Sequence, residues 1–460
     1  MRTDVCIIGA GPAGLMAAIH SAIANAETVV IEGNTAAGRK LLQSGAGRCN
    51  FTHLASPDEI ARAFGPKGRF LSYSLHRFTP EQVRQFFREL GLESKVEQAC
   101  SELARPEPAC GELVEPVEGV EPNGCVFPVT DRAGDVRDVL VKCAESHGVH
   151  FYFGKSVKCV VRDGDSFAVH TAGEIIFAKK MIITTGGLSY PQTGSTGDGY
   201  RFARELGHRI IEPKASLVPL VTRESWPGEL AGASLEDVKI SAVVGGRKVV
   251  AAGPMIFTDD GIGGPAVLDL SRFLTDYLPL RLPPRLLVEG KSRGAAGLSN
   301  NENPTCRTSP IDIYVDVMPG VGEPELDKQI RERIVANPKK TVVGILAFFL
   351  PRRAATTLSE QFNLDAGLLG SELKKDLRKK IVRVLKALPL FVVSTRSIDE
   401  AVVTRGGVSI EQVQSKTMES KISRGVFFAG EVLDVDGPCG GYNLQMCWST
   451  GALAGAAAAI

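Results

Sequence analysis

The stretch Gly9-Ala-Gly-Pro-Ala-Gly14 decides the fold, because it stands between an apolar run and a helical pattern. Residues 4–9 read as a buried parallel strand, and small apolar residues continue the chain beyond Gly14 as a helix. A strand, a GxGxxG turn and a helix in this order form the fingerprint of a Rossmann-type dinucleotide-binding domain. Gly9 permits the tight turn, Gly11 lets a pyrophosphate approach the backbone, and Gly14 lets the helix pack on the sheet.

A second strand at 28–31 ends in an acidic residue, Glu32, which lies 18 residues past Gly14. An acid at this distance accepts hydrogen bonds from ribose hydroxyls and disfavours a 2′-phosphate, so the sequence indicates FAD or NAD rather than NADP. Pro12 suits the first turn of the helix, whose N-terminus offers free N–H groups to a phosphate. A lone GxGxxG is weak, but this context makes dinucleotide binding the favoured interpretation.

Further segments favour FAD over NAD as the cofactor. Residues 38–50, GRKLLQSGAGRCN, combine glycines with Arg and Lys, as expected of a loop around a phosphate or flavin; the alternative is a solvated surface turn. Residues 181–187 and 425–431 are two more apolar strands, of which the first ends in Gly187 and the second in Gly430-Glu431. Gly440-Gly441 then opens a C-terminal helix. Flavoproteins of the glutathione-reductase type share this layout, with an acidic residue near the C-terminus, here Glu431, for the ribityl chain.

The chain resembles the HI0933-like (YhiN-like) family of NAD(P)/FAD-dependent oxidoreductases, which is related to aminoacetone oxidase and to bile-acid Δ4,6-reductase-like flavoproteins. The stretches that carry the resemblance are GAGPAG (9–14), GRKLLQSGAGRCN (38–50), TTGGLSYPQTGSTGDGY (184–200), GGVSIEQVQSKTMESK (406–421) and AGEVLDVDGPCGGYNLQMCWSTG (429–451). The resemblance implies a non-covalent FAD and an inserted β-barrel with a helical cap.

Two features depart from the family pattern. Asp259 and Gly263 stand in Phe257-Thr-Asp-Asp-Gly-Ile-Gly-Gly-Pro265, where relatives usually carry His and Ser. Residues 100–122, rich in Pro and Glu, form an insertion.

The predicted fold class is α/β, with a glutathione-reductase-like Rossmann-type FAD-binding domain interrupted by other structure. We expect a discontinuous FAD-binding domain at 1–204 and 396–460, a β-barrel subdomain at 205–322, where β-rich runs alternate with turns, and a helical subdomain at 323–395. We also expect mobile loops at 100–122 and 286–310. The helical segment includes the basic stretch 373–385, whose apolar spacing indicates a solvated face rather than a nucleic-acid site.

The site residues follow from these motifs and from the resemblance. For the cofactor we predict Gly9, Gly11, Pro12, Ala13, Gly14, Glu32, Gly33, Arg39, Lys40, Ser44, Gly45, Gly47, Arg48, Cys49, Val157, Thr185, Gly186, Gly187, Gly430, Glu431, Asp434, Gly440, Gly441, Tyr442, Asn443 and Gln445. For the substrate side we predict Ser189, Tyr190, Pro191, Thr193, Arg48, Asn50 and Asp259, the last as a partner for a cationic substrate.

The amino-acid composition indicates which kinds of partner, metal site and compartment to expect. Lys plus Arg (53) nearly cancels Asp plus Glu (52), so we expect no nucleic acid partner and no anionic membrane. The ten Cys include no CxxC pair, which leaves a zinc site or a thioredoxin-like motif unsupported and is typical of buried thiols in the cytoplasm. The apolar runs fall short of a membrane span, and residues 1–4 lead directly into a strand without a signal peptide.

The chemistry is expected to be that of the flavin, because the chain lacks the order of a Ser-His-Asp triad, an HExxH and a P-loop. It also lacks a second GxGxxG after a later strand, so a separate NAD(P)H domain is not expected. One interpretation is hydride transfer at N5 to a small enone-like acceptor, with NAD(P)H as a transient donor. The alternatives are an oxygen-dependent amine oxidase and a flavoprotein that acts on tRNA.

Overall fold

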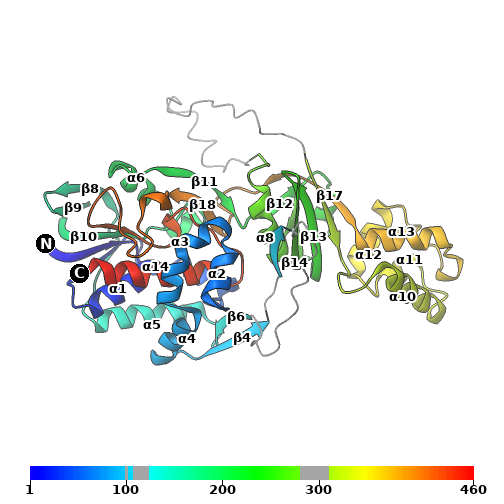
Figure 1. Cartoon of the computed structure of the whole chain (residues 1–460). Coiled ribbons are helices and arrows are strands. Elements are labelled where there is room, and N and C mark those ends of the chain that lie inside the picture. Colours follow the sequence, from blue (N-terminus) through cyan, green and yellow to red (C-terminus); the bar gives the residue numbers. More distant parts are fainter. Residues whose placement is uncertain (99–101, 107–123, 280–309) are drawn as a thin grey trace. The chain divides into compact units, whose positions relative to one another are not determined.

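The computed structural model describes residues 1–98, 102–106, 124–279 and 310–460. The described residues fall into two compact units (Figure 1). Unit 1 comprises 1–98, 124–216 and 401–460, and unit 2 comprises 102–106, 217–279 and 310–400. Unit 1 is therefore assembled from segments of both halves of the chain.

The main sheet of unit 1 is parallel at its centre. Its strand order is β19-β10-β1-β2-β7, and all four of these pairings are parallel. The strands are β1 (Arg2–Ile8), β2 (Thr28–Glu32), β7 (His150–Phe153), β10 (Ile175–Ile183) and β19 (Val426–Phe428). β8 (Val157–Asp163) and β9 (Ser166–Thr171) extend β10 as antiparallel strands. β1 and β2 are almost wholly buried, as expected of parallel strands covered on both faces.

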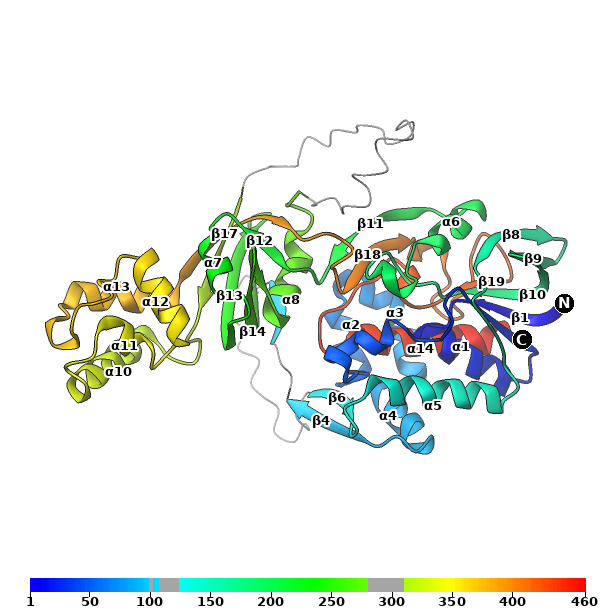
Figure 2. The same cartoon turned by 180° about the vertical axis from the view of Figure 1, so that it is seen from behind.

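Two helices from opposite ends of the sequence pack side by side in unit 1. They are α1 (Pro12–Ile23) and α14 (Tyr442–Ala458), which run together in both Figure 1 and Figure 2. A Cβ added at Gly451 would lie 2.4 Å from the Ala13 carbonyl oxygen, and one at Gly455 would lie 2.2 Å from that of Ala17. Glycine is therefore required at both positions for the helices to approach this closely.

Smaller elements complete unit 1 around this sheet. β3 (Thr52–Leu54), β6 (Gly124–Pro128) and β4 (Ser94–Gln98) form a separate antiparallel sheet, and β11 (Ile210–Ser216) pairs with β18 (Val403–Val408). The helices are α2 (Pro57–Ala63), α3 (Gly68–Arg77), α4 (Pro80–Glu89), α5 (Ala133–Ser146) and α6 (Asp198–Glu205). Trp448 of α14 is fully buried and donates from Nε1 to the Phe51 carbonyl at 2.7 Å, which ties the last helix to the start of β3.

Unit 2 contains a closed antiparallel barrel, as the sequence predicts. The ring of strands is β13-β16-β17-β12-β15-β14, closed by pairing of β14 with β13. Their bounds are β12 (Leu220–Thr222), β13 (Ser234–Val244), β14 (Arg247–Thr258), β15 (Gly261–Gly263), β16 (Ile311–Asp316) and β17 (Leu388–Thr395). Buried and exposed residues alternate along β13 and β16, since one face of each strand lines the barrel interior.

One strand lies where the sequence indicated only a loop. Within the predicted loop 100–122, β5 (Glu102–Pro106) pairs antiparallel with β14. The remainder of that loop, and 286–309 of the second predicted loop, lie outside the described residues. The backbone pairing of β5 uses the edge of β14, which the local composition of the loop could not reveal.

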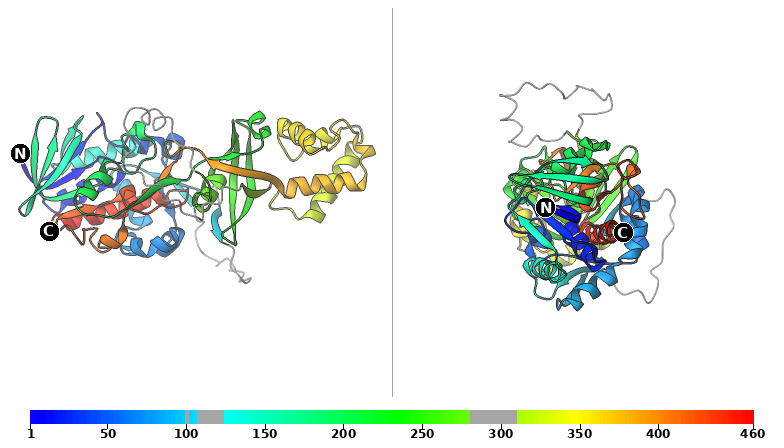
Figure 3. Two further views of the ribbon diagram at one scale, coloured as in Figure 1. Left: turned by 90° about the horizontal axis from the view of Figure 1, so that it is seen from above. Right: turned by 90° about the vertical axis from the view of Figure 1, so that its left-hand side faces the viewer.

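The helices of unit 2 gather beside the barrel (Figure 3). Short α7 (Trp226–Glu229) and α8 (Pro265–Leu274) lie close to the strands, and α10 (Glu323–Ala336), α11 (Val342–Leu346), α12 (Arg352–Gln361) and α13 (Lys375–Lys386) form a group of their own. One hydrophobic core joins this group to the barrel, with Leu326, Ile330, Ile381 and Leu385 among its buried members. Among the helices described, none is both long and apolar enough to cross a membrane.

Candidate functional site

The GxGxxG turn lies between β1 and α1 and is tightly packed except at one position. Gly9 has a φ of +104°, and a Cβ added at Gly14 would lie 2.0 Å from the Gly9 carbonyl oxygen. A Cβ at Gly11, by contrast, would meet no atom within 4 Å. The backbone at Gly11 is therefore open at the N-terminus of α1, with Pro12 and Ala13 in its first turn. This arrangement suits an approaching phosphate group.

Thr184, which is not among the predicted cofactor residues, holds this turn from the neighbouring strand. Its hydroxyl donates to the carbonyl oxygens of Ile8 at 3.0 Å and Gly9 at 2.8 Å. Thr185 and Gly186 follow at the end of β10, and the Thr185 Oγ1 atom is buried with no hydrogen-bond partner among the described residues.

Glu32 lies at the end of β2 and connects the glycine turn to the next loop. Its carboxylate accepts from the Ala10 N–H at 2.7 Å and from the Asn34 N–H at 2.8 Å. The segment before β8 runs beside it, since Lys155 N–H donates to the Glu32 carbonyl at 3.0 Å and a Cβ at Gly33 would lie 3.2 Å from Ser156 Oγ. The buried Val157 follows directly.

Asn34 links the predicted loops to one another. Its side-chain amide donates to Glu32 Oε1 at 2.7 Å and to the Thr193 carbonyl at 3.0 Å, and its Oδ1 accepts from Arg39 at 2.8 Å. Pro191 begins the short helical turn that ends at Thr193. Thr193 also folds back on Tyr190, donating to its carbonyl from N–H at 2.8 Å and from Oγ1 at 2.7 Å. Tyr190 is held at a φ of +51°, an uncommon conformation for a residue with a side chain.

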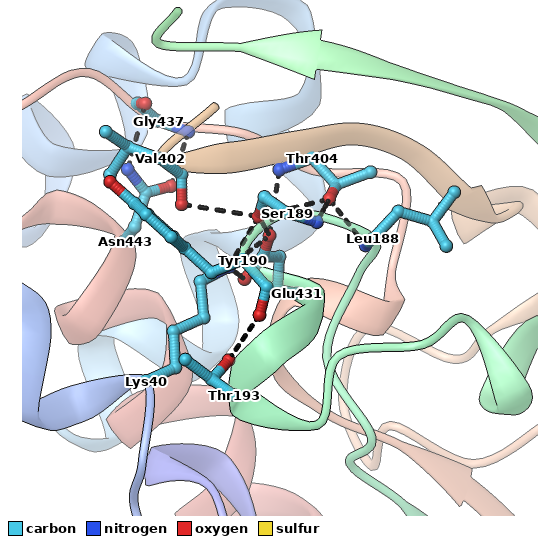
Figure 4. Close-up of polar contacts among 10 residues, drawn as sticks. All are labelled: Lys40, Leu188, Ser189, Tyr190, Thr193, Val402, Thr404, Glu431, Gly437 and Asn443. Atoms are coloured by element: carbon cyan, nitrogen blue, oxygen red, sulfur yellow. Dashed lines mark hydrogen bonds and ion pairs between the residues drawn. The ribbon is translucent and has the colours of Figure 1, made fainter. Parts of the chain in front are cut away.

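A polar hub forms where Lys40, Ser189 and Glu431 meet (Figure 4). Lys40 Nζ lies 2.7 Å from Glu431 Oε2 and 2.6 Å from Ser189 Oγ, and Ser189 Oγ donates to Glu431 Oε1 at 3.0 Å. Thr404 N–H donates to Glu431 Oε1 at 2.8 Å, and Thr404 Oγ1 accepts from the Ser189 N–H at 3.0 Å. The Ser189 side chain is fully buried, so its hydroxyl contacts Lys40 and Glu431 rather than solvent.

The glycines around the hub leave no room for side chains. A Cβ at Gly187 would lie 2.3 Å from Thr404 Oγ1, and one at Gly430 would lie 2.7 Å from the Ala13 Cβ atom. The strand ends that carry Gly187 and Gly430 therefore lie directly against the residues of the site.

A second group of charges surrounds Asp434. Lys67, which is not among the predicted site residues, lies with its Nζ 2.5 Å from Asp434 Oδ1 and 4.0 Å from Asp436 Oδ1. Asp436 also accepts from Ser216 Oγ at 2.9 Å and lies 3.9 Å from Arg405 Nε. Tyr200 is buried near Glu431 and Asp434. Burial, together with the negative charges of these two carboxylates, raises the pKa of its phenol.

The Gly440-Gly441 turn meets Asn50 and His53. Gly441 has a φ of +94°, and its Cβ would lie 2.4 Å from the Thr52 carbonyl oxygen and 2.8 Å from Asn50 Oδ1. Asn50 Oδ1 is buried and lacks a hydrogen-bond partner among the described residues, so it is an acceptor available to a ligand. His53 bonds the Gly440 carbonyl through Nδ1 at 2.9 Å and stacks on Tyr442 at 4.5 Å, and burial lowers its pKa.

Asn443 and Gln445 serve the local structure of α14. Asn443 bonds both backbone groups of Gly437, at 2.8 and 2.9 Å. Gln445 is buried, accepts from Thr52 Oγ1 at 2.5 Å and donates to the Phe78 carbonyl at 2.9 Å. These contacts fix the entry of the helix that Gly440 and Gly441 begin.

Two basic residues of the loop 38–50, Lys40 and Arg48, lie in different surroundings. Lys40 enters the hub, whereas Arg48 forms ion pairs with Glu97 and Asp131 and lies over the Phe127 ring at 4.1 Å. Those carboxylates raise the Arg48 pKa.

Other residues of this loop shape its backbone. Ser44 Oγ donates to the Leu41 carbonyl at 2.6 Å, and Gly45 and Gly47 have positive φ angles. Burial raises the pKa of the Cys49 thiol to about 12, so this thiol has little thiolate character.

Asp259 belongs to unit 2 and is described there by itself. It is exposed in the turn between β14 and β15, next to Asp260, whose carboxylate pairs with Arg396 at 2.6 Å. The Asp259 carbonyl packs on Gly228, where a Cβ would lie 2.5 Å away.

These residues fit a dinucleotide cofactor. The open backbone at Gly11 and the acid at the end of β2 are features by which a Rossmann-type domain binds a dinucleotide. The unpartnered Asn50 Oδ1 is a further unsatisfied acceptor in unit 1. The fold and the site define the chain as an FAD-dependent oxidoreductase. The chain belongs to the family described as HI0933-like protein Rossmann domain, whose model matches residues 3–101 and 117–457.

Comparisons with known proteins agree with this family. The chain is 29% identical to a 3-dehydro-bile acid delta(4,6)-reductase of Clostridium scindens over 98% of both chains. It is 28% identical to a ribosomal RNA dihydrouridine synthase of Escherichia coli over 98% of this chain and 96% of that protein. Among solved structures, 3-ketosteroid delta1-dehydrogenase of Sterolibacterium denitrificans shares the fold, with a TM-score of 0.51, 12% identity, and coverage of 100% and 99%.

Proposed function

We propose that the protein, with FAD bound, reduces a carbon–carbon double bond conjugated to a carbonyl group at the expense of NAD(P)H. The observation that carries this proposal is the full-length similarity to two proteins whose names describe related chemistry. A Δ4,6 double-bond system beside a 3-oxo group and the C5–C6 bond of uridine beside its C4 carbonyl are both activated toward hydride at the β-carbon. The substrate class is thus an α,β-unsaturated carbonyl compound, whether a small molecule or a uracil ring.

The residues present would hold FAD along unit 1. Gly9, Gly11 and Gly14 would receive the pyrophosphate, Glu32 the adenosine ribose, and Glu431 and Asp434 the ribityl side. FAD supplies hydride transfer at N5 when it is bound. The Lys40 ammonium would offset the charge of Glu431, and Gly440-Gly441 would direct backbone N–H groups at the cofactor.

Reduction of the double bond also needs a proton at the α-carbon. We assign this proton to the Tyr190 phenol, because Tyr190 is held in the left-handed conformation by two hydrogen bonds from Thr193, beside the hub. The hydride and this proton together saturate the bond, NAD(P)H becomes NAD(P)⁺, and water restores the phenol. Thr193 is then a positioning residue, and Ser189 positions Lys40 and Glu431.

An anaerobic flavin titration tests the proposal. NADH or NADPH is expected to bleach the flavin, and a 3-oxo-4-ene steroid or a uridine-containing RNA is expected to restore its colour. The matched control is the corresponding saturated 3-oxo steroid, which should leave the flavin reduced. Bleaching by amines instead of NAD(P)H, with recovery only on admission of oxygen, would establish the oxidase alternative. Tyr190→Phe should slow recovery by the enone but not bleaching by NAD(P)H.

A further inference from the structure

The near-neutral charge of the whole chain conceals a strong segregation of charge. Residues 323–386 contain 14 Lys and Arg against 8 Asp and Glu, a net charge of +6. Because the whole chain carries +1, the remaining residues carry −5. The four helices α10–α13 are therefore the cationic part of an otherwise acidic protein.

The structure places an unpaired row of these charges on the outside of α13. Ile381, Val384 and Leu385 are buried in the core of unit 2, and the opposite face carries Lys375, Lys379 and Arg383. All three are exposed and recur every four residues, about 6 Å apart along the helix axis. Within the described part of the chain, none of the three has an acidic side chain within 4.0 Å. By contrast, Arg378 and Lys386 of the same helix pair with Asp327 and Asp316.

More basic residues gather at the N-terminal end of α13. Ser371 N–H donates to the Pro338 carbonyl at 3.1 Å and Gly370 N–H to the Lys340 carbonyl at 2.8 Å, so residues 338–340 run beside the start of this helix. Lys339 and Lys340 are thereby brought toward Lys374 and Lys375. We call Lys339, Lys340, Lys374, Lys375, Lys379 and Arg383 the cationic face.

An exposed aromatic ring adjoins this face. Phe348 is 38% exposed, with Lys340 Nζ 4.4 Å and the Arg333 guanidinium 4.9 Å from its ring centroid. Cations together with an exposed aromatic ring are the features that bind single-stranded nucleic acid, through phosphate contacts and base stacking.

We infer that the cationic face binds the phosphate backbone of single-stranded RNA. A membrane-binding helix would present large apolar side chains between its Lys and Arg, and the row on α13 has none.

Neutralising the row on α13 tests the inference. The variant carries Lys375→Gln, Lys379→Gln and Arg383→Gln, and the matched control carries Lys142→Gln, Lys158→Gln and Arg424→Gln, exposed residues of unit 1. Binding of a labelled, uridine-containing single-stranded RNA is measured against salt concentration, with flavin content as a check on folding. Because the α13 variant has no cation left in this row to pair with phosphates, the slope of log affinity against log salt should fall by about 2. Its affinity at about 0.1 M salt should fall on the order of a hundredfold.

The outcomes separate the inference from the proposed function. The control should bind RNA like the unmodified protein, and the α13 variant should still reduce a small enone at an unchanged rate. Equal losses in both variants, absence of RNA binding, or binding only to vesicles that contain phosphatidylserine would overturn the inference while leaving enone reduction intact. If RNA binds through α13 but neither uridine nor the enone is reduced, the proposed function fails and the RNA surface stands.

Discussion

Lys40 and Glu431 lie 391 positions apart in the sequence, yet Lys40 Nζ and Glu431 Oε2 are 2.7 Å apart in the structure. Their side chains are 23% and 13% exposed, so the pair is largely removed from water. Because Glu431 also accepts from Ser189 and Thr404, it joins the loop after β2, the loop after β10 and the strand β18 at one point. The first and last parts of unit 1 are thus connected through one carboxylate.

Glu431→Gln should therefore destabilise the FAD-free protein. The substitution removes the charge from several hydrogen bonds at a mostly buried position, at an expected cost of about 1–3 kcal/mol in the free energy of unfolding. The control is Glu411→Gln, whose exposed partner Arg209 makes a surface ion pair, and its cost should stay below about 0.5 kcal/mol. Urea unfolding compares the two; equal small losses would contradict a structural role for the hub.

Gly11→Ala tests whether the open backbone at Gly11 receives a phosphate group of the cofactor, and it does so without disturbing the fold. The added methyl group meets no atom within 4 Å, so unfolding of the FAD-free protein should change by less than about 1 kcal/mol. The affinity for FAD should fall at least about tenfold, or about 1.4 kcal/mol, because the methyl group occupies the approach of the pyrophosphate. Gly134→Ala in α5, where a Cβ is equally unobstructed, should leave FAD affinity unchanged, as flavin fluorescence would report.

Three histidines whose pKa values are lowered should make the protein less stable in mild acid. Burial lowers the pKa of His20 from 6.5 to about 4, so below 6.5 the unfolded chain binds a proton that the folded chain refuses. The contribution of His20 to the free energy of unfolding should be fully present above pH 6.5. It should be lost as the pH falls toward 4, by up to about 3 kcal/mol.

Thermal unfolding of the FAD-free protein across this range measures the effect. His20→Gln should reduce the slope, with the remainder due to His53 and His208, whose pKa values burial also lowers. An unchanged slope in this variant would assign the loss to other groups.

Cys49→Ala should leave turnover intact. The thiol is fully buried and its pKa of about 12 keeps it protonated, so it does not supply a redox-active thiolate. Reaction with a thiol reagent in the folded protein should likewise spare Cys49 and the buried Cys6 and Cys447, while the partly exposed Cys159 reacts. A large loss of the catalytic rate on Cys49→Ala, with flavin content unchanged, would contradict this.

The local part of the proposed cofactor site was predictable from sequence, because its signals all lie within the first 32 residues. Gly9, Gly11, Gly14 and Glu32 combine a strand, a tight turn and an acid at a fixed spacing, and the structure places them between β1, α1 and β2 as the spacing indicates. The short alternating runs similarly indicated a small antiparallel barrel or sandwich, and the family resemblance implied the barrel that the structure shows.

The partners from other parts of the chain were not predictable. Thr404 and Lys67 belong to no motif, and they meet Glu431 and Asp434 only because the tertiary fold brings them there. The strand β5 was missed for the same reason. The net charge of the whole chain likewise carries no information on where the Lys and Arg of α10–α13 are placed, so the expectation of no nucleic acid partner stays a prediction.

The close fit of α14 against α1 has a consequence for synthesis on the ribosome. Gly451 and Gly455 admit the backbone of α1 at Ala13 and Ala17, so α1 acquires this partner only after α14, more than 400 residues later in the sequence, has emerged. Until then the apolar surface of α1 has no α14 to cover it, and the nascent protein lacks the residues that complete its cofactor site. A truncated translation product that ends before α14 should therefore be unable to retain flavin and should be a target for chaperones or proteases.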